Sequence, residues 1–128
     1  MTGIERIVSS RTAPAKGPYS HAVKAGGFVF VSGMGPVDPK TGEVRLGEIE
    51  EQVRLTLNNV RAVLEDAGAS LPSVVKTTVY LREMNDFPRM NAVYAEYFGD
   101  AKPARTTIQA ARLPLDIGVE IDAVAWVG

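Results

Sequence analysis

The apolar residues between Ile49 and Ala67 recur at intervals of three or four, and this pattern constrains the fold more than any other in the chain. Its members are Ile49, Val53, Leu57, Val60, Leu64 and Ala67. Such spacing predicts an amphipathic helix of about five turns with one apolar face. Gly68 suits the position just after a helix, so we expect the helix to end there. A helix with one apolar face needs a partner layer on which to pack.

The segments around this helix have the turn residues and the two-residue period of β-strands. Strands are predicted at 4–8 (at an edge), near 20–25, and at 28–32, 73–82, 104–110 and 118–127. Gly26 and Gly27 separate the second and third of these strands in the manner of a tight hairpin. The 28–32 strand is apolar almost throughout, which favours burial on both of its faces.

Two of these strands alternate clearly enough to assign their faces. The 73–82 strand is expected to place Val75, Thr77, Val79 and Leu81 on one face. The 118–127 strand alternates Val119, Ile121, Ala123 and Ala125 with Glu120, Asp122, Val124 and Trp126. Because the second set includes apolar residues, we interpret that face as one that is buried in an oligomer.

A second, shorter helix is predicted between the last strands. Asp86 can cap it, Pro88 is tolerated in its first turn and Gly99 ends it. Its inner stripe would be Met90, Val93, Tyr94, Tyr97 and Phe98. The element order then favours the α+β class, in which about six strands form a mixed sheet and both helices pack on one face. The 128 residues have the size of one domain, which we expect to span 1–128.

Composition excludes several classes of function. The net charge is −1 and we find no basic tract, so we expect no nucleic-acid partner. No apolar run approaches the ~20 residues of a membrane helix, and the first residues lack the features of a signal peptide. Cysteine is absent, which rules out disulfides and thiolate chemistry and fits a reducing compartment; we expect a cytoplasmic protein. One histidine and no cysteine are too few soft ligands for a zinc site.

Arg105 is the first candidate for chemistry. It lies in the segment 103–107, at the start of a predicted strand, and its guanidinium offers a rigid fork of donors that matches a carboxylate. This indicates a site for a small carboxylic acid. The alternative, which spacing alone favours, is an arginine that is solvated or paired on the surface.

Other polar residues have an ordinary interpretation beside a functional one. Glu120 fits a solvated carboxylate on the outer face of an edge-like strand, and Tyr19 fits a loop anchor. Asn91 fits an exposed position of the second helix, and Ser32 fits a partner for backbone groups. We expect His21, the only histidine, in a loop or on the surface.

Together these residues lie in segments that resemble the RidA/YjgF family, the reactive intermediate deaminases that act on enamines and imines. The resemblance extends from about residue 11 to residue 127. The matching segments are 13–14, 17–20, 31–33, 38–42, 75–81, 84–87, 91–94, 103–105, 111–114 and 119–121.

The resemblance implies a chorismate-mutase-like fold and a homotrimer with sites in clefts between subunits. It implies that Arg105 binds the substrate carboxylate and acts in catalysis with Glu120 and Tyr19. Ser32, Gly33, Asn91 and Thr107 match other positions of the substrate pocket. The implied reaction is hydrolysis of 2-aminoacrylate, 2-iminobutyrate and related compounds to 2-oxo acids and ammonia, without a cofactor or a metal.

Two positions depart from the family pattern. Many deaminases of the family have cysteine where this chain has Thr107, and glutamine is usual where it has Met34. These changes leave room for a 2-aminomuconate-type deaminase that acts on another carboxylated imine. A second alternative is a non-catalytic sensor or holdase, since the same cleft could bind small carboxylates without turnover. A third is the nucleic-acid role attributed to some relatives, against which the near-neutral charge argues.

Overall fold

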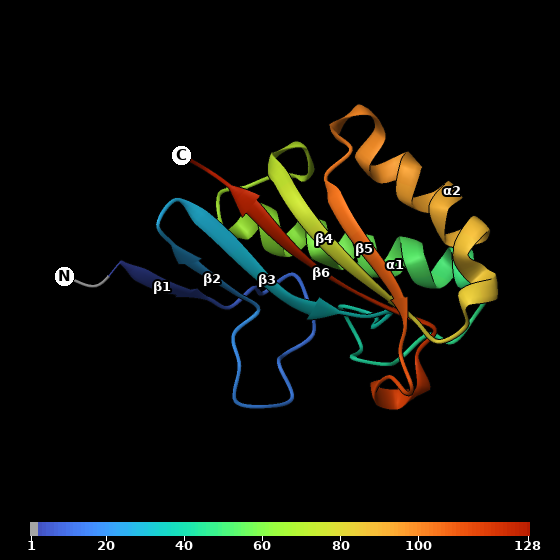
Figure 1. The fold of residues 1–128 in the computed structure, drawn as a ribbon. Coiled ribbons are helices and arrows are strands. Elements are labelled where there is room, and N and C mark those ends of the chain that lie inside the picture. The colour runs from blue at the N-terminus through green and yellow to red at the C-terminus, as the bar shows by residue number, and fades with distance from the viewer. Residues whose placement is uncertain (1–2) are drawn as a thin grey trace.

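The computed structural model describes residues 3–128, which form one mixed sheet of six strands and two α-helices (Figure 1). Residues 1 and 2, the start of the domain predicted over 1–128, lie outside the described residues. In chain order the elements are β1 (Ile4–Ile7), β2 (Ala22–Ala25), β3 (Phe28–Met34), α1 (Ile49–Asp66), β4 (Val74–Leu81), α2 (Phe87–Phe98), β5 (Ala104–Gln109) and β6 (Val119–Trp126). The predicted α+β class is confirmed.

The strand order in the sheet is β1-β2-β3-β6-β4-β5. Neighbouring strands are antiparallel except for β4 and β5, which are parallel. The prediction that Glu120 lies on an edge-like strand is therefore wrong, because β6 sits between β3 and β4. Pairing between segments so far apart along the chain leaves no trace in the local residue pattern.

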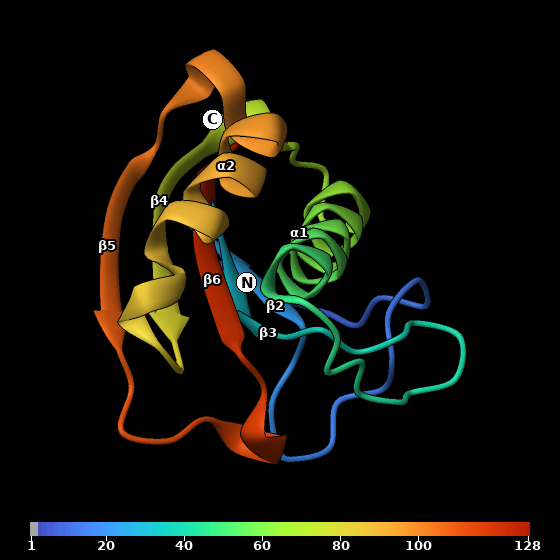
Figure 2. The same cartoon turned by 90° about the vertical axis from the view of Figure 1, so that its right-hand side faces the viewer.

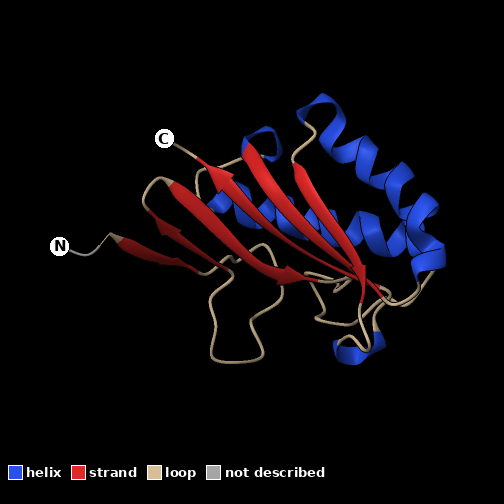
Figure 3. Ribbon diagram, viewed as in Figure 1, coloured by secondary structure: helices blue, strands red, loops and turns tan. Residues whose placement is uncertain are grey.

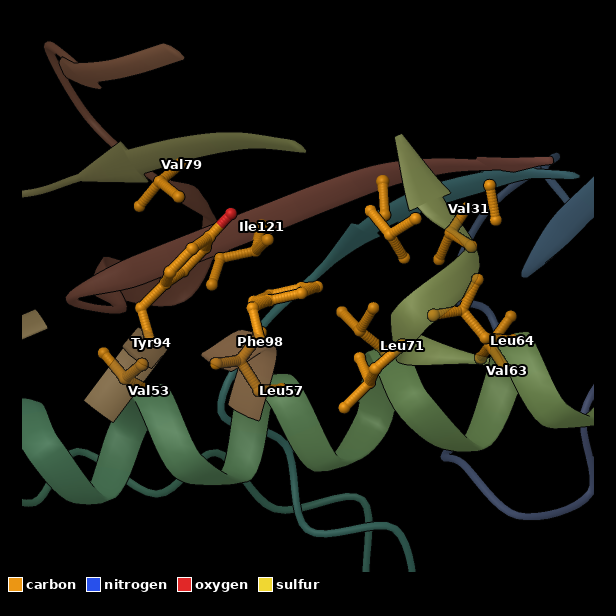
Figure 4. Packing of buried hydrophobic residues seen from close by; sticks show 14 of the residues in the cluster. Val31, Val53, Leu57, Val63, Leu64, Leu71, Val79, Tyr94, Phe98 and Ile121 are labelled. Carbon is orange, nitrogen blue, oxygen red and sulfur yellow. The ribbon is translucent and has the colours of Figure 1, made fainter. Parts of the chain in front are cut away.

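Both helices cover the same face of the sheet, as the end-on view of Figure 2 shows. The apolar stripe of α1 is fully buried at Val53, Leu57, Val60 and Leu64, where it packs beneath the strands (Figure 4). Burying each such side chain contributes about 1.5–3 kcal/mol. Gly68 has a φ of 82°, which confirms the predicted stop of α1. Within residues 3–128, none of the helices is both long and apolar enough to cross a membrane.

The inner stripe of α2 is confirmed, because Met90, Val93, Tyr94 and Phe98 are buried and Tyr97 packs partly against them. Asp86 occupies the position before the helix, but its side chain makes no capping hydrogen bond. A short 3-10 turn, Met84–Asp86, leads into α2 and sets Asp86 in a helical conformation, which differs from the extended backbone of an ordinary cap.

The second face of the sheet is uncovered in the single chain. Phe28, Phe30 and Trp126 are 38%, 47% and 56% exposed there. The prediction that the 28–32 strand is buried on both faces is thus wrong for one chain, because both helices pack on the same side. The exposed aromatic residues instead form an apolar surface on β3 and β6.

One shift of register changes the predicted inner face of β4. Thr77, Val79 and Leu81 point to the core as expected, but Val75 is 44% exposed and Val74 is buried in its place. The pairing of β4 with β6 shifts between Val74 and Lys76. A bulge of this kind reverses the alternation at its position.

Loops gather at one end of the sheet, where β3 ends and β6 begins (Figure 3). They comprise residues 8–21, 35–48 and 110–118. Loops that a rigid sheet holds together in this way often carry binding residues.

Candidate functional site

The predicted site residues fall into two groups on opposite faces of the sheet. The arginine group comprises Arg105 and Thr107 on β5 and Asn91 on α2. The glutamate group comprises Tyr19, Ser32, Gly33 and Glu120, at the loop end of β3 and β6. Arg105 pairs with Thr77 and Thr107 with Val79 across β4 and β5, and both partners are buried on the helix side. Glu120 lies between the buried residues Val119 and Ile121, so it points to the uncovered face.

Arg105 is partly buried between β5 and α2. Its guanidinium carbon lies 4.7 Å from the ring centre of Tyr94 and 5.4 Å from that of Phe87. Nη1 also lies 3.9 Å from Met90 Sδ. Among residues 3–128, no carboxylate forms a salt bridge with Arg105. Two aromatic faces thus hold a permanent cation that no carboxylate of the described residues pairs with.

Tyr94 ties this cation to the sheet. Its hydroxyl points toward the strands (Figure 4) and lies 2.7 Å from Thr77 Oγ1. Burial raises the pKa of Tyr94 above its ordinary value, so the phenol stays neutral at physiological pH. The ring therefore presents a fixed, uncharged face to Arg105.

Asn91 and Thr107 bring unpaired polar atoms to the same region. Asn91 follows Phe87 by four residues and precedes Tyr94 by three, so these three side chains share one stripe of α2. Asn91 Oδ1 and Thr107 Oγ1 are both buried without a hydrogen-bond partner among residues 3–128. The interpretation of Asn91 as an exposed polar residue is therefore wrong for its side-chain oxygen, which is buried. Such unpaired buried atoms are uncommon and call for an explanation.

Glu120 provides the carboxyl group of the glutamate group. Burial raises the pKa of Glu120 above that of an ordinary carboxyl, and the nearby Asp122 carboxylate raises it further. A side chain at Gly33 would run into the Glu120 carboxylate. The glycine on β3 is thus what allows this carboxylate to lie across the neighbouring strand.

Hydrogen bonds attach the loop that carries Tyr19 to the end of β3. Ser32 Oγ donates to the carbonyl of Ser20 at 2.7 Å, and Ser32 N donates to the carbonyl of His21 at 2.9 Å. The interpretation of Ser32 as a partner for backbone groups therefore holds. The Tyr19 side chain is 55% exposed beside this junction.

His21 lies in a loop, as predicted, but it is only 3% exposed, so the alternative of a surface histidine is wrong. Its Nδ1 accepts a hydrogen bond from Ser9 N at 2.9 Å, and Nε2 lies 2.9 Å from the carbonyl of Ala13. These two bonds require the neutral ring with its proton on Nε2. His21 thereby holds the 8–21 loop in place. Its two hydrogen-bond partners come together only when the loop is folded, so no local sequence pattern indicated its burial.

Two pockets lie near the loop end, and only one adjoins the predicted residues. A pocket of about 350 Å³ is lined by Tyr19 and Gly33 together with apolar loop residues. A larger one, of about 750 Å³, lies at the start of α1 and includes none of the predicted site residues. Its Arg89 is already paired with Glu48 and Glu50, both at 2.7 Å. We therefore place the candidate site at the smaller pocket and at Arg105.

No three His, Asp or Glu side chains within residues 3–128 gather closely enough to hold a metal ion. The two groups offer a cation that can bind the carboxylate of a ligand and a carboxyl group with a raised pKa that can transfer a proton. They also offer several polar atoms that can orient the ligand.

This fold and these two groups of residues define a class of small α+β proteins, and solved structures with the YjgF and L-PSP fold have the same architecture. The family described as endoribonuclease L-PSP matches residues 10–127. The chain belongs to this family, which is the YjgF/RidA family.

Its relatives match over nearly their whole lengths. A RutC family protein of Pyrococcus horikoshii is 52% identical over 124 residues, which cover 96% of this chain and 98% of the relative. TdcF of Escherichia coli, which bears the provisional name of a reactive intermediate deaminase, is 40% identical over 95% of this chain and 97% of its own. The crystal structure of TdcF with bound serine gives a TM-score of 0.91 and covers 97% of this chain and 99% of that chain.

Proposed function

We propose that this protein hydrolyses enamines and imines of the 2-aminoacrylate and 2-iminobutyrate type to 2-oxo acids and ammonia. One observation carries the proposal: the partly buried guanidinium of Arg105 rests on two aromatic rings and has no carboxylate partner within residues 3–128. A charge in that setting is stabilised when an anion binds. The planar fork of arginine suits the bidentate grip of a substrate carboxylate.

The reaction needs few groups. The enamine 2-aminoacrylate takes up a proton at its methylene carbon and gives the imine. Water then adds to the C=N carbon, the C–N bond breaks, and pyruvate and ammonia leave. The imine carbon is already electrophilic, so positioning is the main task and neither nucleophile nor cofactor is required.

Glu120 is the group that we assign to proton transfer. Its raised pKa brings it nearer to physiological pH, where a carboxyl group exchanges protons most effectively. Tyr19 closes the pocket beside Gly33 and offers a hydroxyl to the substrate. Ser32 holds the loop that carries Tyr19, and Asn91 and Thr107 bring polar atoms to the region of Arg105.

We further propose a homotrimer in which the arginine group of one subunit meets the glutamate group of the next. The two groups lie on opposite faces of one sheet, so a single chain does not join them. The exposed aromatic surface of Phe28, Phe30 and Trp126 supports packing between copies.

The alternatives differ in what they require. A 2-aminomuconate-type deaminase would use the same Arg105 for a larger carboxylated imine. A sensor or holdase would bind small carboxylates without turnover, and the serine in the TdcF structure is a small carboxylate. The family description names an endoribonuclease, but a net charge of −1 without a basic tract argues against RNA as the substrate here.

The decisive experiment follows the loss of freshly generated 2-aminoacrylate by trapping with semicarbazide. Purified protein should accelerate the loss, and Arg105→Ala should reduce kcat/KM by about 100- to 1000-fold, as expected for a lost charge-stabilising donor. Arg105→Lys is the matched control: it keeps the charge, loses the fork and should retain only a small part of the rate. Thermal unfolding of both variants checks that the fold persists.

Each alternative has its own result in this experiment. Turnover by Arg105→Ala at the rate of the wild type would refute the role of the arginine. Binding of 2-oxo acids without any turnover would favour the sensor. RNA cleavage that survives Arg105→Ala would favour a nuclease.

A further inference from the structure

The pocket beside Tyr19 and Gly33 is much larger than the proposed small substrates need. Its volume is about 350 Å³, which is room for roughly ten water molecules. The side chain of 2-aminoacrylate is a single carbon. A substrate whose reacting carbon lies between Tyr19 and Gly33 would therefore leave most of this space unfilled.

The lining of the pocket is mainly apolar. It includes Pro14, Met34, Val37, Val44, Pro114 and Leu115. Two of the polar residues that reach it are engaged within the protein: Asn59 Nδ2 donates to the carbonyls of Gly35 and Val37, at 3.1 and 2.9 Å, and both ring nitrogens of His21 are hydrogen-bonded. Thr12 Oγ1 is buried without a partner within residues 3–128. Lys16 and Tyr19 are the other polar residues of the lining, and the apolar residues outnumber the polar ones.

Leu115 provides a second, independent observation. It has a φ of 59°, a left-handed conformation that costs a residue other than glycine roughly 1–2 kcal/mol. It is also 60% exposed at the edge of the pocket. The fold accepts both backbone strain and an exposed leucine here, and residues held in this way concentrate at ligand sites.

Met34 also lines the pocket and follows Gly33 in the chain. It is partly buried against the core and reaches the pocket. A thioether on an unbranched, flexible side chain adapts to apolar ligands of irregular shape. Glutamine, the usual residue of the family at this position, would place an amide there that needs hydrogen bonds.

We propose that this pocket binds the substrate side chain, and that the protein prefers imines of amino acids with larger apolar side chains, such as the leucine-derived imine, over 2-aminoacrylate. The inference rests on the proposed function, because the carboxylate and the C=N carbon are held as described above. Met34 and Leu115 are then the residues that determine specificity.

The test compares two imines in one assay. An L-amino acid oxidase generates the leucine-derived imine, a serine dehydratase generates 2-aminoacrylate, and semicarbazide traps what the protein leaves. We expect kcat/KM to be at least about 10-fold higher for the leucine-derived imine, since each methylene in an apolar pocket discriminates by about 10-fold or more.

Three variants locate the preference. Met34→Gln keeps the length of the side chain, and Leu115→Asn suits the left-handed backbone. Each should lower kcat/KM for the leucine-derived imine about 5- to 10-fold and change that for 2-aminoacrylate less than 2-fold. Met34→Leu is the matched control and should keep the preference. Equal kcat/KM for the two imines in the wild type, or equal losses for both in Met34→Gln and Leu115→Asn, would overturn the inference.

A binding measurement separates this inference from the proposed function. Calorimetry should show 4-methyl-2-oxopentanoate binding at least about 10-fold more tightly than pyruvate, and Leu115→Asn should remove the difference. Selective binding with no turnover of either imine would overturn the proposed reaction and keep the pocket assignment. Turnover without selectivity in either assay would overturn the pocket assignment alone.

Discussion

The arginine group and the glutamate group are built in different ways. Arg105 lies on an edge strand, pressed against α2, where Tyr94 and Phe87 hold it on the covered side of the sheet. Glu120 lies on a central strand, on the uncovered side, beside loops that Ser32 and His21 fasten. The first group has a cation that no carboxylate pairs with in the part of the chain that the structure describes, and the second has a carboxyl group with a raised pKa. In the homotrimer proposed above each group is half of a site, and the difference teaches that one chain would then supply two halves for two different clefts.

The largest expected effect comes from separating the copies. Phe30→Asp places a charge on the uncovered face, where Phe30 is 47% exposed. Because a charge buried between copies is costly, the variant should be monomeric and its activity should fall by more than about 100-fold. Light scattering and the imine assay measure the two effects.

Leu46→Asp is the control for this variant, because Leu46 is also exposed, at 57%, but lies beside the start of α1. It should leave mass and activity unchanged. A monomeric Phe30→Asp with full activity would show that one chain contains a whole site.

The second prediction concerns subunits that carry different halves. Arg105→Ala and Glu120→Ala should each be nearly inactive alone. If each cleft takes Arg105 from one subunit and Glu120 from the next, random mixing leaves about a quarter of the clefts intact. Co-refolded 1:1 mixtures should then recover about a quarter of the wild-type rate. A mixture as inactive as its components would place both residues in the cleft of one chain.

The third prediction sharpens the role of the glutamate group. Glu120→Gln should lower kcat/KM by about 10- to 100-fold, because an amide cannot transfer a proton. In the wild type, kcat/KM should fall as the pH is lowered through the raised pKa of Glu120, and this acidic limb should be absent from the variant. A pH profile over the acidic range measures both, and an unchanged limb in Glu120→Gln would assign it to another group.

Stability should respond to the same carboxyl group with the opposite sign. Because burial raises its pKa in the folded state, the folded chain binds this proton more tightly than the unfolded chain. The wild type therefore loses stability as the pH rises from the ordinary carboxyl pKa through the raised one. Glu120→Gln lacks this loss, so its Tm should exceed that of the wild type by about 1–3 °C at pH 7 and match it at pH 4.

The smallest effect is expected in the arginine group. Thr107→Val removes a buried hydroxyl that has no partner within residues 3–128 and keeps the shape of the side chain, so it should stabilise the fold by up to about 1 kcal/mol. Activity should change by less than about 3-fold if Thr107 only shapes the pocket. Thr56→Val is the matched control, since Thr56 Oγ1 is also buried without a partner among residues 3–128 but lies on α1, which carries none of the predicted site residues. A large loss of activity in Thr107→Val alone would give its hydroxyl a direct role.

Elements with a strong local period were predictable from the sequence. The stripe from Ile49 to Ala67 set the length and the buried face of α1, and Gly68 marked its end. The alternation in β6 identified its core side, although not its neighbours. Local sequence determines such features because the repeat of a helix or a strand fixes which side chains share a face.

Features that depend on distant contacts were not predictable. The central place of β6, the bulge beside Val75 and the burial of His21 arise from pairing and packing between remote segments. The site shows the same limit. Arg105 was proposed from its place at the start of a strand and the other members from the resemblance, but no local pattern revealed that Arg105 and Glu120 face opposite ways. The aromatic rings that hold Arg105 were missed as well, because they belong to the core stripe of another element.

The central position of β6 has a consequence for how the protein is made. β3 and β4 both pair with residues 119–126, so each keeps a bare edge until that segment leaves the ribosome. Bare edges with aromatic side chains recruit foreign strands. Joining them requires a search across most of the chain, which is slow. We therefore expect nascent chains to expose aggregation-prone strand edges until β6 pairs with β3 and β4.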